Sequence, residues 1–290
     1  MATVIYINQN CIKILDGHQT QENYYVKDYK KIMMKYNEND KEQYVQELIH
    51  ILNQLDIDSA TLVLHTRNIS WKIGEIPQMK SIHLAREVIK KELEDITDAQ
   101  KEYVCDFRLM KKQDKAGIRV LMFAVEKEKI EFYVNIFKQT RVKLTKIDVT
   151  LNSIIKIYEH VFCRHHQTMA IISIENKDVN TFLFIDGKFR YYGKDSMFND
   201  YDSLTLRNEL INKVSQVIQF QRGNFRDSTL EDIVVVGLPE EDFSVLQISI
   251  KNLFQIDVKN IDYYDLLDKR SQKIDINEGI VNLGALKEWS

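Results

Sequence analysis

The chain of 290 residues contains only 9 glycines, 2 prolines and 3 cysteines. Phosphate-binding loops are built largely from glycine, because a backbone without side chains can approach an anion closely. Few stretches of this sequence can therefore supply such a loop. The cysteines Cys11, Cys105 and Cys163 are widely spaced, which excludes a disulfide framework and suits a reducing compartment. We therefore expect a cytosolic protein with little material for an anion-binding loop.

Long apolar runs and an excess of one charge are also missing. The longest apolar runs, such as residues 120–125 and 233–236, are far shorter than the roughly 20 residues that span a bilayer. The N-terminal stretch lacks the pattern of a signal peptide. The 40 basic and 43 acidic residues give a net charge of -3, which does not favour nucleic acid or an anionic membrane as the main partner. A hydrophobic share of 44% is that of an ordinary folded protein with a substantial core.

The first part of the chain predicts a β-β-β-α-β order. Alternation of apolar and polar residues predicts three strands, at residues 3–7, 11–15 and about 24–34. The Asp16-Gly17 pair predicts a positive-φ turn between the second and the third strand. Residues 41–55 have the apolar spacing of a helix, and residues 60–65 form a short buried strand.

The same order returns at residue 169. Strands are predicted at residues 169–174, 180–185 and 188–193, followed by a helix at 203–222, a strand at 232–236 and a helix at 240–253. Asp186-Gly187 lies where Asp16-Gly17 lies in the first copy. The repeat predicts a duplicated β-β-β-α-β-α unit, with two α/β lobes facing each other across a cleft. The alternative is a pair of unrelated α/β domains with a coincidental strand order.

A small α+β section interrupts the first copy. It comprises a strand to about Ile76, a helix capped by Ser81, and strands at 103–110 and 118–125. The helix has an apolar stripe, consisting of Ile82, Ala85, Ile89, Leu93 and Ile96. We therefore predict four segments: a first lobe at residues 1–68 and 126–162, an inserted subdomain at 69–125, and a second lobe at 163–290. Within 126–162 we expect a helix at 126–138, a strand at 142–148 and a helix at 150–161.

This layout resembles the actin-like (ribonuclease H-like) fold, and the insertion resembles that of the type IV pilus assembly protein PilM. The matching positions are Ile76, Pro77, Met79, Ala85, Glu92, Ile96, Tyr103 and Asp106, together with the strand end at Ile147-Asp148. The family's second proline is missing, since Thr97 follows Ile96. Its Ala-Gly before the later strand is Gln139-Thr140 here.

In actin-like ATPases three turns hold the nucleotide, and the resemblance places these turns on degenerate sequences. Aligned on Lys13, the first turn has Tyr6 for the aspartate near the metal and Asn8 for glycine, with Gln9, Asn10 and Cys11 for the serines. The second has Ser173 for aspartate and Glu175 for glycine, with Asp178 and Val179 at the threonine positions. The third keeps one glycine, Gly237, and has Leu238 for the other.

These replacements oppose a nucleotide. A glutamate about 4 Å from a phosphate charge costs roughly 4 kcal/mol at an effective dielectric near 20, or about a thousandfold in binding. Tyr6 and Ser173 also remove carboxylates that would hold Mg²⁺. We therefore expect a pseudo-ATPase with no catalytic residues, cofactor or metal, and a remnant site at Lys13 and Gly237 with Asn8 and Glu175. Plain hairpin turns without ligand, or weak ATP binding through Lys13 and backbone amides, are the readings left open.

Two other groups of residues can each be interpreted either as a binding site or as an ordinary part of the fold. His160, Cys163, His165 and His166 could ligate a metal or simply favour a helix C-terminus. Arg222, Phe225 and Arg226 could contact single-stranded nucleic acid, although a helix that ends at Gly223 explains them as well. No Walker A, GxSxG, HExxH or CxxC pattern is present, so hydrolase and redox readings have no anchor.

The resemblance implies a cytoplasmic scaffold of type IV pilus biogenesis. Its implied partners are the N-terminal cytoplasmic peptide of a PilN-like inner-membrane protein and the pilus assembly ATPase machinery, and it reaches the inner face of the membrane only through its partner. An extended peptide would be held by backbone bonds and apolar pockets. The expected groove residues are Ile76, Pro77, Met79, Tyr103 and Phe107, which the sequence does not distinguish from core residues. The alternatives are an ATP-binding FtsA-like filament protein and the cytoplasmic domain of a GspL-like type II secretion protein, which would continue into a membrane span.

Overall fold

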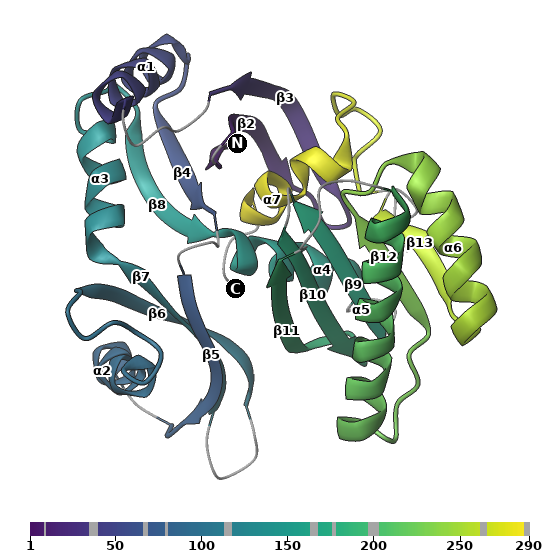
Figure 1. Ribbon diagram of the computed structural model, residues 1–290. Helices are drawn as coiled ribbons and strands as arrows, with labels where there is room; N and C mark the ends of the chain where they lie inside the picture. Colours follow the sequence, from purple (N-terminus) through teal and green to yellow (C-terminus); the bar gives the residue numbers. More distant parts are fainter. Residues whose placement is uncertain are drawn as a thin grey trace. The chain divides into compact units, whose positions relative to one another are not determined.

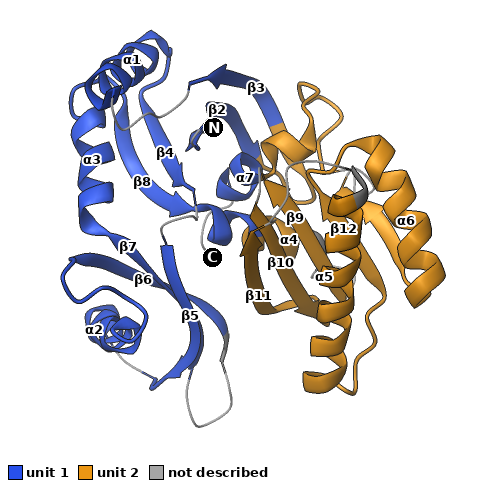
Figure 2. Ribbon diagram, in the orientation of Figure 1, with its two compact units in different colours: residues 1–18, 26–154, 281–290 blue, residues 19–25, 155–280 orange. Residues whose placement is uncertain are grey.

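The computed structural model forms two compact units (Figure 2). Unit 1 comprises residues 1–18, 26–154 and 281–290, and unit 2 comprises residues 19–25 and 155–280. The structure describes all residues except 9, 35–39, 66–68, 79–80, 113–117, 163–167, 176–177, 197–202, 262–265 and 287–290. Each unit is built on one five-stranded sheet, and unit 1 also carries a three-stranded sheet.

The large sheet of unit 1 has the strand order β3-β2-β1-β4-β8. Its strands are β1 (Ala2–Ile7), β2 (Cys11–Gln19), β3 (Tyr24–Met33), β4 (Ser59–Leu64) and β8 (Lys143–Val149). β1 is antiparallel to β2 and parallel to β4, and β4 is parallel to β8. Helices α1 (Lys41–Gln54) and α3 (Lys127–Phe137) lie side by side along this sheet (Figure 1). α1 buries Tyr44, Leu48 and Leu52, as its helical spacing predicts.

The sheet of unit 2 repeats this arrangement, with the order β11-β10-β9-β12-β13. Its strands are β9 (Met169–Glu175), β10 (Asp178–Ile185), β11 (Lys188–Ser196), β12 (Asp232–Val236) and β13 (Asp257–Asn260). Helices α5 (Ser203–Asn224) and α6 (Glu240–Phe254) pack on it through a continuous apolar core. The shared order and strand directions confirm the predicted duplication.

The two copies differ at the hairpin that the sequence predicted for both. Asp186 and Gly187 have φ of 51° and 70°, so the predicted positive-φ turn is confirmed between β10 and β11. The prediction for Asp16-Gly17 was wrong, because β2 continues through both residues and Gly17 pairs with Ala2. The turn lies at residues 20–23, where the Thr20 hydroxyl donates to Asn23 O and accepts from Asn23 N, both at 2.8 Å. The long ladder with β1 therefore overrides the local turn preference.

The inserted subdomain is a three-stranded sheet covered on one face by a helix. Its elements are β5 (Ile69–Ile76), α2 (Ile82–Leu93), β6 (Tyr103–Lys112) and β7 (Ile118–Glu126), in the strand order β5-β7-β6. The Ser81 hydroxyl accepts from His83 N at 3.2 Å, which confirms the predicted N-cap. The two ends of the predicted stripe are not core: Ile82 and Ile96 are 61% and 41% exposed. Ile82 is the first helical residue and Ile96 follows the helix end, so the buried part of the stripe consists of Ala85, Ile89 and Leu93.

Two helices pass from one unit to the other along the chain. α4 (Thr150–Phe162) has its first five residues in unit 1, and α7 (Ile276–Leu286) has its last six there. The units place residues 19–25, 155–162 and 281–290 differently from the lobes predicted from the sequence. Within unit 1, α7 is fixed by Asn282, whose side-chain amide donates to Val4 O at 3.1 Å and to Lys13 O at 3.0 Å.

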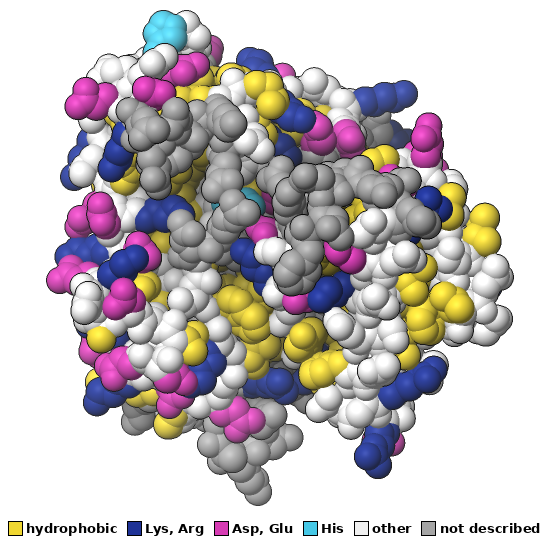
Figure 3. Space-filling model, in the orientation of Figure 1, with side chains coloured by type: hydrophobic (Ala, Val, Ile, Leu, Met, Phe, Trp, Pro, Cys, Tyr) yellow, Lys and Arg dark blue, Asp and Glu magenta, His cyan; other side chains and the backbone are white. Residues whose placement is uncertain are grey.

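Acidic and basic side chains are interspersed over the visible face of the molecule (Figure 3), in keeping with the small net charge. Hydrophobic side chains also reach the surface, among them Val245, Ile248 and Leu253 of α6. Within the described ranges, none of the helices combines the length and the apolar character that crossing a membrane requires.

Candidate functional site

The first candidate turn joins β1 to β2, and the amides of its described residues Asn8, Asn10 and Cys11 are already hydrogen-bonded. The side-chain oxygen of Asn8 accepts from Asn10 N at 2.9 Å and from Cys11 N at 2.8 Å. Asn8 N donates to Cys11 O at 3.1 Å. This is an Asx turn, in which a side chain takes the place of an external acceptor. A phosphate at these amides would have to displace the Asn8 carboxamide.

Tyr6 and Lys13, the residues across from each other on β1 and β2, are also engaged. The Tyr6 ring is fully buried and stacks on His65, with ring centroids 6.3 Å apart. The Lys13 ammonium lies 5.7 Å from the centroid of the same ring, in cation–π range. The position that the resemblance aligns with the metal-side aspartate of actin-like ATPases therefore holds a buried aromatic ring. The structure brings Asn8 and Lys13 together on one hairpin of unit 1.

The second candidate turn joins β9 to β10 in unit 2 and is flanked by carboxylates. Glu175 and Asp178 are directly opposite each other in the ladder. Asp178 is buried and lies 3.6 Å from the Lys194 ammonium, and its carboxylate accepts from the Ser196 hydroxyl at 3.3 Å. Ser173, at the other metal-side position, is buried. Two carboxylates at the mouth of one turn disfavour an anion there, although Lys194 lies beside Asp178.

The third candidate turn follows β12, and Gly237 is required there by packing. Its φ is +82°, and a Cβ at this position would lie 2.1 Å from Ile174 O. The turn therefore packs directly on β9, one residue before Glu175. Gly237 N donates to the side-chain oxygen of Asn277 at 3.1 Å. Leu238 is buried, so it replaces a second glycine by a core contact.

The histidine cluster contributes one described residue, His160, and both of its ring nitrogens have close partners within unit 2. Nδ1 lies 3.1 Å from Gln19 Nε2, and Nε2 lies 3.1 Å from Glu22 O. The ring also meets Tyr24 edge-on, with centroids 5.5 Å apart. Cys163, His165 and His166 lie outside the described residues, and among the others no group of metal-ligating side chains occurs. His160 is therefore used to pack the hairpin against α4.

The arginine-rich helix end is also structural. α5 continues to Asn224, so Gly223 does not end the helix as predicted. Phe225 packs on Phe220, with ring centroids 6.3 Å apart, and its carbonyl accepts from Gln221 Nε2 at 3.0 Å. Its ring is partly buried against the core of unit 2. It therefore does not present a stacking platform for a base.

The predicted partner residues mostly lie under helix α2. Ile76 is buried in the core of the insertion, and Tyr103 and Phe107 pack on that core from β6. Pro77 is exposed directly after β5, and Met79 lies outside the described residues. The opposite face of this sheet was not singled out from the sequence.

That opposite face carries Arg108, which joins the insertion to α4. The buried guanidinium donates to Asn152 Oδ1 at 3.0 Å, and Asn152 Nδ2 donates to Asp148 Oδ1 at 2.7 Å. The same carboxylate oxygen accepts from Val149 N at 2.8 Å. Alternation along β6 places Val104 on the same face, where it is 44% exposed. The exposed Val104 and the buried link to the lobe therefore share one face.

No sequence profile of a known protein family matches the chain, and no curated protein matches it. Solved structures do. The PilM-PilN type IV pilus biogenesis complex matches with a TM-score of 0.76 and 14% identity, covering 98% of this chain and 97% of that one. A Bacteroides thetaiotaomicron protein with actin-like ATPase fold matches with 0.59 and 10% identity, covering 97% and 94%. The cytoplasmic domain of EpsL, from the type II secretion system of Vibrio cholerae, matches with 0.50 and 9% identity, covering 99% and 95%.

These likenesses confirm the predicted actin-like fold and the resemblance of this chain to PilM in fold. They extend over almost the whole chain, so the inserted subdomain is part of the shared architecture.

Proposed function

We propose that this protein is an actin-fold scaffold of a type IV pilus or a related secretion machine, which binds the N-terminal peptide of a PilN-like inner-membrane protein and does not hydrolyse ATP. The likeness in fold to the PilM-PilN complex supports the partner class. The proposal that ATP is not hydrolysed rests on one observation, which is that backbone amides of the turns are already hydrogen-bonded. The amides of Cys11 and Gly237 donate to the side chains of Asn8 and Asn277.

The chemistry at these turns explains why turnover is not expected. Phosphoryl transfer depends on amides, cations and Mg²⁺ that stabilise charge on the transferred group. Here the metal-side positions hold the buried Tyr6 and Ser173, and Glu175 adds a negative charge. We infer that the fold serves as a frame for its inserted subdomain.

The partner peptide is assigned to the margin of the inserted sheet at Val104, on the face opposite α2; the middle of that face, including Leu121 and Arg108, is already buried by the chain itself. Val104 is exposed there, and by strand pairing Trp71 and Ile73 share this face with Arg108. Both are half-buried, so they offer apolar contact area without exposing a large patch to water. An extended peptide with apolar side chains at alternate positions fits this surface. Pro77, at the end of β5, lies at the margin of the sheet.

Through such a partner, the protein would be held at the inner face of the membrane. The partner's transmembrane span, rather than any segment described here, would provide the anchor. The pilus assembly ATPase machinery would then supply the energy that this chain does not.

The test is a titration of the full chain with the N-terminal cytoplasmic peptide of the single-span membrane protein that co-purifies with it. We expect saturable binding that Val104→Asp weakens at least tenfold. Val245→Asp is the matched control, because Val245 is 40% exposed on α6 of unit 2 and should leave the affinity unchanged. Absence of binding at high micromolar peptide, or phosphate release from ATP and Mg²⁺ above the protein-free rate, would overturn the proposal.

A further inference from the structure

The turn between α3 and β8 forms a hollow that has no role in the function proposed above. Its volume is about 410 Å³, and the lining comes from a single stretch of the chain: Val134, Phe137, Lys138, Thr140, Arg141, Val142, Lys143 and Leu144. It lies at the last turn of α3, whereas the inserted subdomain joins the first turn of this helix through β7. The hollow and the proposed peptide face are therefore at opposite ends of α3.

The floor of the hollow is apolar. Phe137 and Val142 are buried, and Val134 and Leu144 are half-buried beside them. An apolar side chain that enters between Val134 and Leu144 would lose contact with water on both sides. A volume of about 410 Å³ is within the range of ligand-binding clefts, which are mostly apolar.

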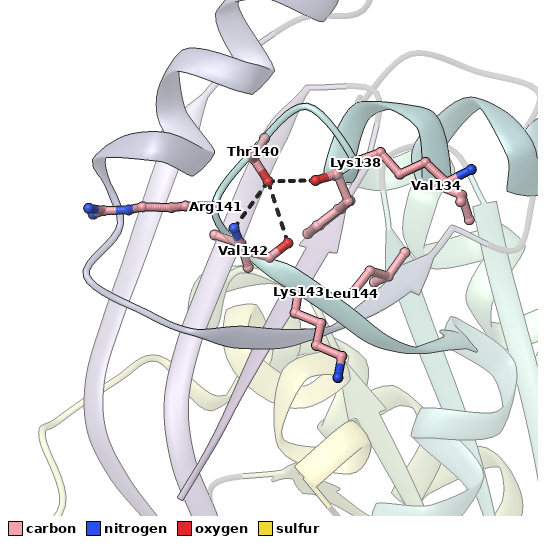
Figure 4. A pocket seen from close by; sticks show the side chains of 8 residues that line it. Val134, Lys138, Thr140, Arg141, Val142, Lys143 and Leu144 are labelled. Atoms are coloured by element: carbon pink, nitrogen blue, oxygen red, sulfur yellow. Dashed lines mark hydrogen bonds between the residues drawn. The ribbon is translucent and has the colours of Figure 1, made fainter.

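The turn is preformed by its own hydrogen bonds (Figure 4). The Thr140 hydroxyl donates to Phe137 O at 2.9 Å and accepts from Val142 N at 3.3 Å. Arg141 N donates to Asn53 Oδ1 at 3.0 Å, and the Arg141 guanidinium donates to Leu55 O. These bonds fix the turn to the end of α1, so a ligand does not have to order it on binding.

The rim is basic. Lys138 and Lys143 are exposed, and within the described part of the chain neither forms an ion pair. Three of the eight lining residues are basic and none is acidic. Lys138 follows the last turn of α3, where a cation is favoured by the helix dipole. Lys143 begins strand β8, so a helix dipole does not explain a lysine at this position.

The neighbouring strand limits the shape of the partner. β8 is the last strand in the order of its sheet, so one of its edges is not paired with another described strand. A register shift between Ala60 and Thr61 leaves Thr145 as an extra residue in β8. Such a bulge increases the local twist of the strand and disfavours the addition of a long flat strand. The strand therefore favours a short ligand.

We propose that this hollow binds a short acidic and apolar segment of a partner protein, with an apolar side chain between Val134 and Leu144 and carboxylates on Lys138 and Lys143. Charge complementarity selects the partner, since the rim offers two cations without internal counterions.

The experiment uses the full chain and a probe hexapeptide in which two leucines are flanked on each side by two acidic residues. Amide NMR spectra should show shifts confined to residues 134–144 at peptide concentrations up to about 5 mM, where millimolar dissociation constants give measurable occupancy. Lys138→Glu/Lys143→Glu should weaken binding at least tenfold. The control Lys188→Glu/Arg226→Glu makes the same charge change at exposed positions in unit 2 and should alter affinity less than twofold.

Two further probes complete the test. A peptide with lysines in place of the acidic residues should not bind, and vesicles of anionic phospholipid should not compete with the acidic peptide. Shifts outside the hollow, equal affinity for the rim variant and the wild type, or displacement by the vesicles would each overturn the proposal. Thermal unfolding of both double variants within about 2 °C of the wild type shows that the fold is intact. Val134→Asp places a charge in the apolar floor and should also weaken binding. It provides a second variant if Lys138→Glu/Lys143→Glu fails to fold.

Discussion

The side-chain oxygen of Asn277, in the first turn of α7, accepts a hydrogen bond from the amide of Gly237 at 3.1 Å. Asn277 N in turn donates to Asp275 Oδ1 at 2.9 Å. The one glycine that resembles a nucleotide-binding turn is thus held by two contacts of its own unit, because its Cα also packs on the Ile174 carbonyl. Keeping this glycine is a requirement of the fold and gives no support to ligand binding.

The first prediction concerns nucleotide. Millimolar ATP with Mg²⁺ should change the melting temperature of the chain by less than about 1 °C, since a ligand stabilises the native state only in proportion to ln(1 + [L]/Kd). Differential scanning fluorimetry measures this shift. A saturable rise that depends on both ATP and Mg²⁺ would contradict the prediction, and magnesium with phosphate alone is the control.

The second prediction concerns the contact between α7 and α4 within unit 1. A Cβ on Gly284 would lie 1.9 Å from Ser153 O, so Gly284→Ala forces the two helices apart. We expect a loss of about 1–3 kcal/mol of unfolding free energy, as for other overpacked sites, measured by urea denaturation.

Gly223 in α5 is the matched control. No atom lies within 4 Å of the position its Cβ would take. Gly223→Ala should therefore raise the unfolding free energy by about 0.5–1 kcal/mol, because alanine restricts the unfolded chain and favours a helix. Equal effects of the two substitutions would show that the helix contact is not tight.

The third prediction concerns the link between the insertion and α4. Arg108→Met should cost about 1–3 kcal/mol, because it leaves the buried Asn152 oxygen without its donor. Arg86→Met on the same subdomain removes an exposed pair with Asp106 at 3.4 Å and should change stability by no more than about 0.5 kcal/mol. Urea denaturation compares the two. If Arg86→Met destabilises the protein as much as Arg108→Met does, the buried hydrogen bond of Arg108 does not contribute more stability than the exposed ion pair.

The fourth prediction concerns pH. Burial of Tyr192 raises the pKa of its hydroxyl well above the ordinary value, and the nearby charge of Asp178 raises it further. The hydroxyl donates to Asn180 Oδ1 at 2.6 Å. Because the folded-state pKa is above the unfolded value of about 10, this group contributes stability below pH 10 and loses it as the pH rises further.

Urea denaturation of the wild type and of Tyr192→Phe, at neutral pH and at about pH 11, tests this sign. The wild type should lose more stability than the variant over this interval, since phenylalanine has no proton to release. Lysines and other tyrosines titrate in both proteins and cancel in the comparison. A parallel loss in the two proteins would mean that Tyr192 is not responsible.

Local patterns predicted most elements to within a few residues. Alternation identified β9, β10 and β11, helical spacing identified α1 and α2, and Ser81 was correctly expected as an N-cap, because each of these depends on neighbours in the sequence. The predicted turn at Asp16-Gly17 was wrong because pairing with another strand, and not the local sequence, decides the structure there. Its local preference for a turn matches that of Asp186-Gly187, but pairing with β1 carries β2 past it to Gln19.

The sequence by itself determined that this chain is a duplicated α/β protein with an insertion, and that the three turns aligned with nucleotide-binding turns lack the carboxylates and all but one glycine of that pattern. Only the tertiary structure decided how the remaining amides are used and which face of the inserted sheet lies under a helix. Asn277 is 40 residues from Gly237, and Arg108 is 44 residues from Asn152. Contacts across such distances depend on how sheets and helices pack, and no periodicity in the sequence encodes them.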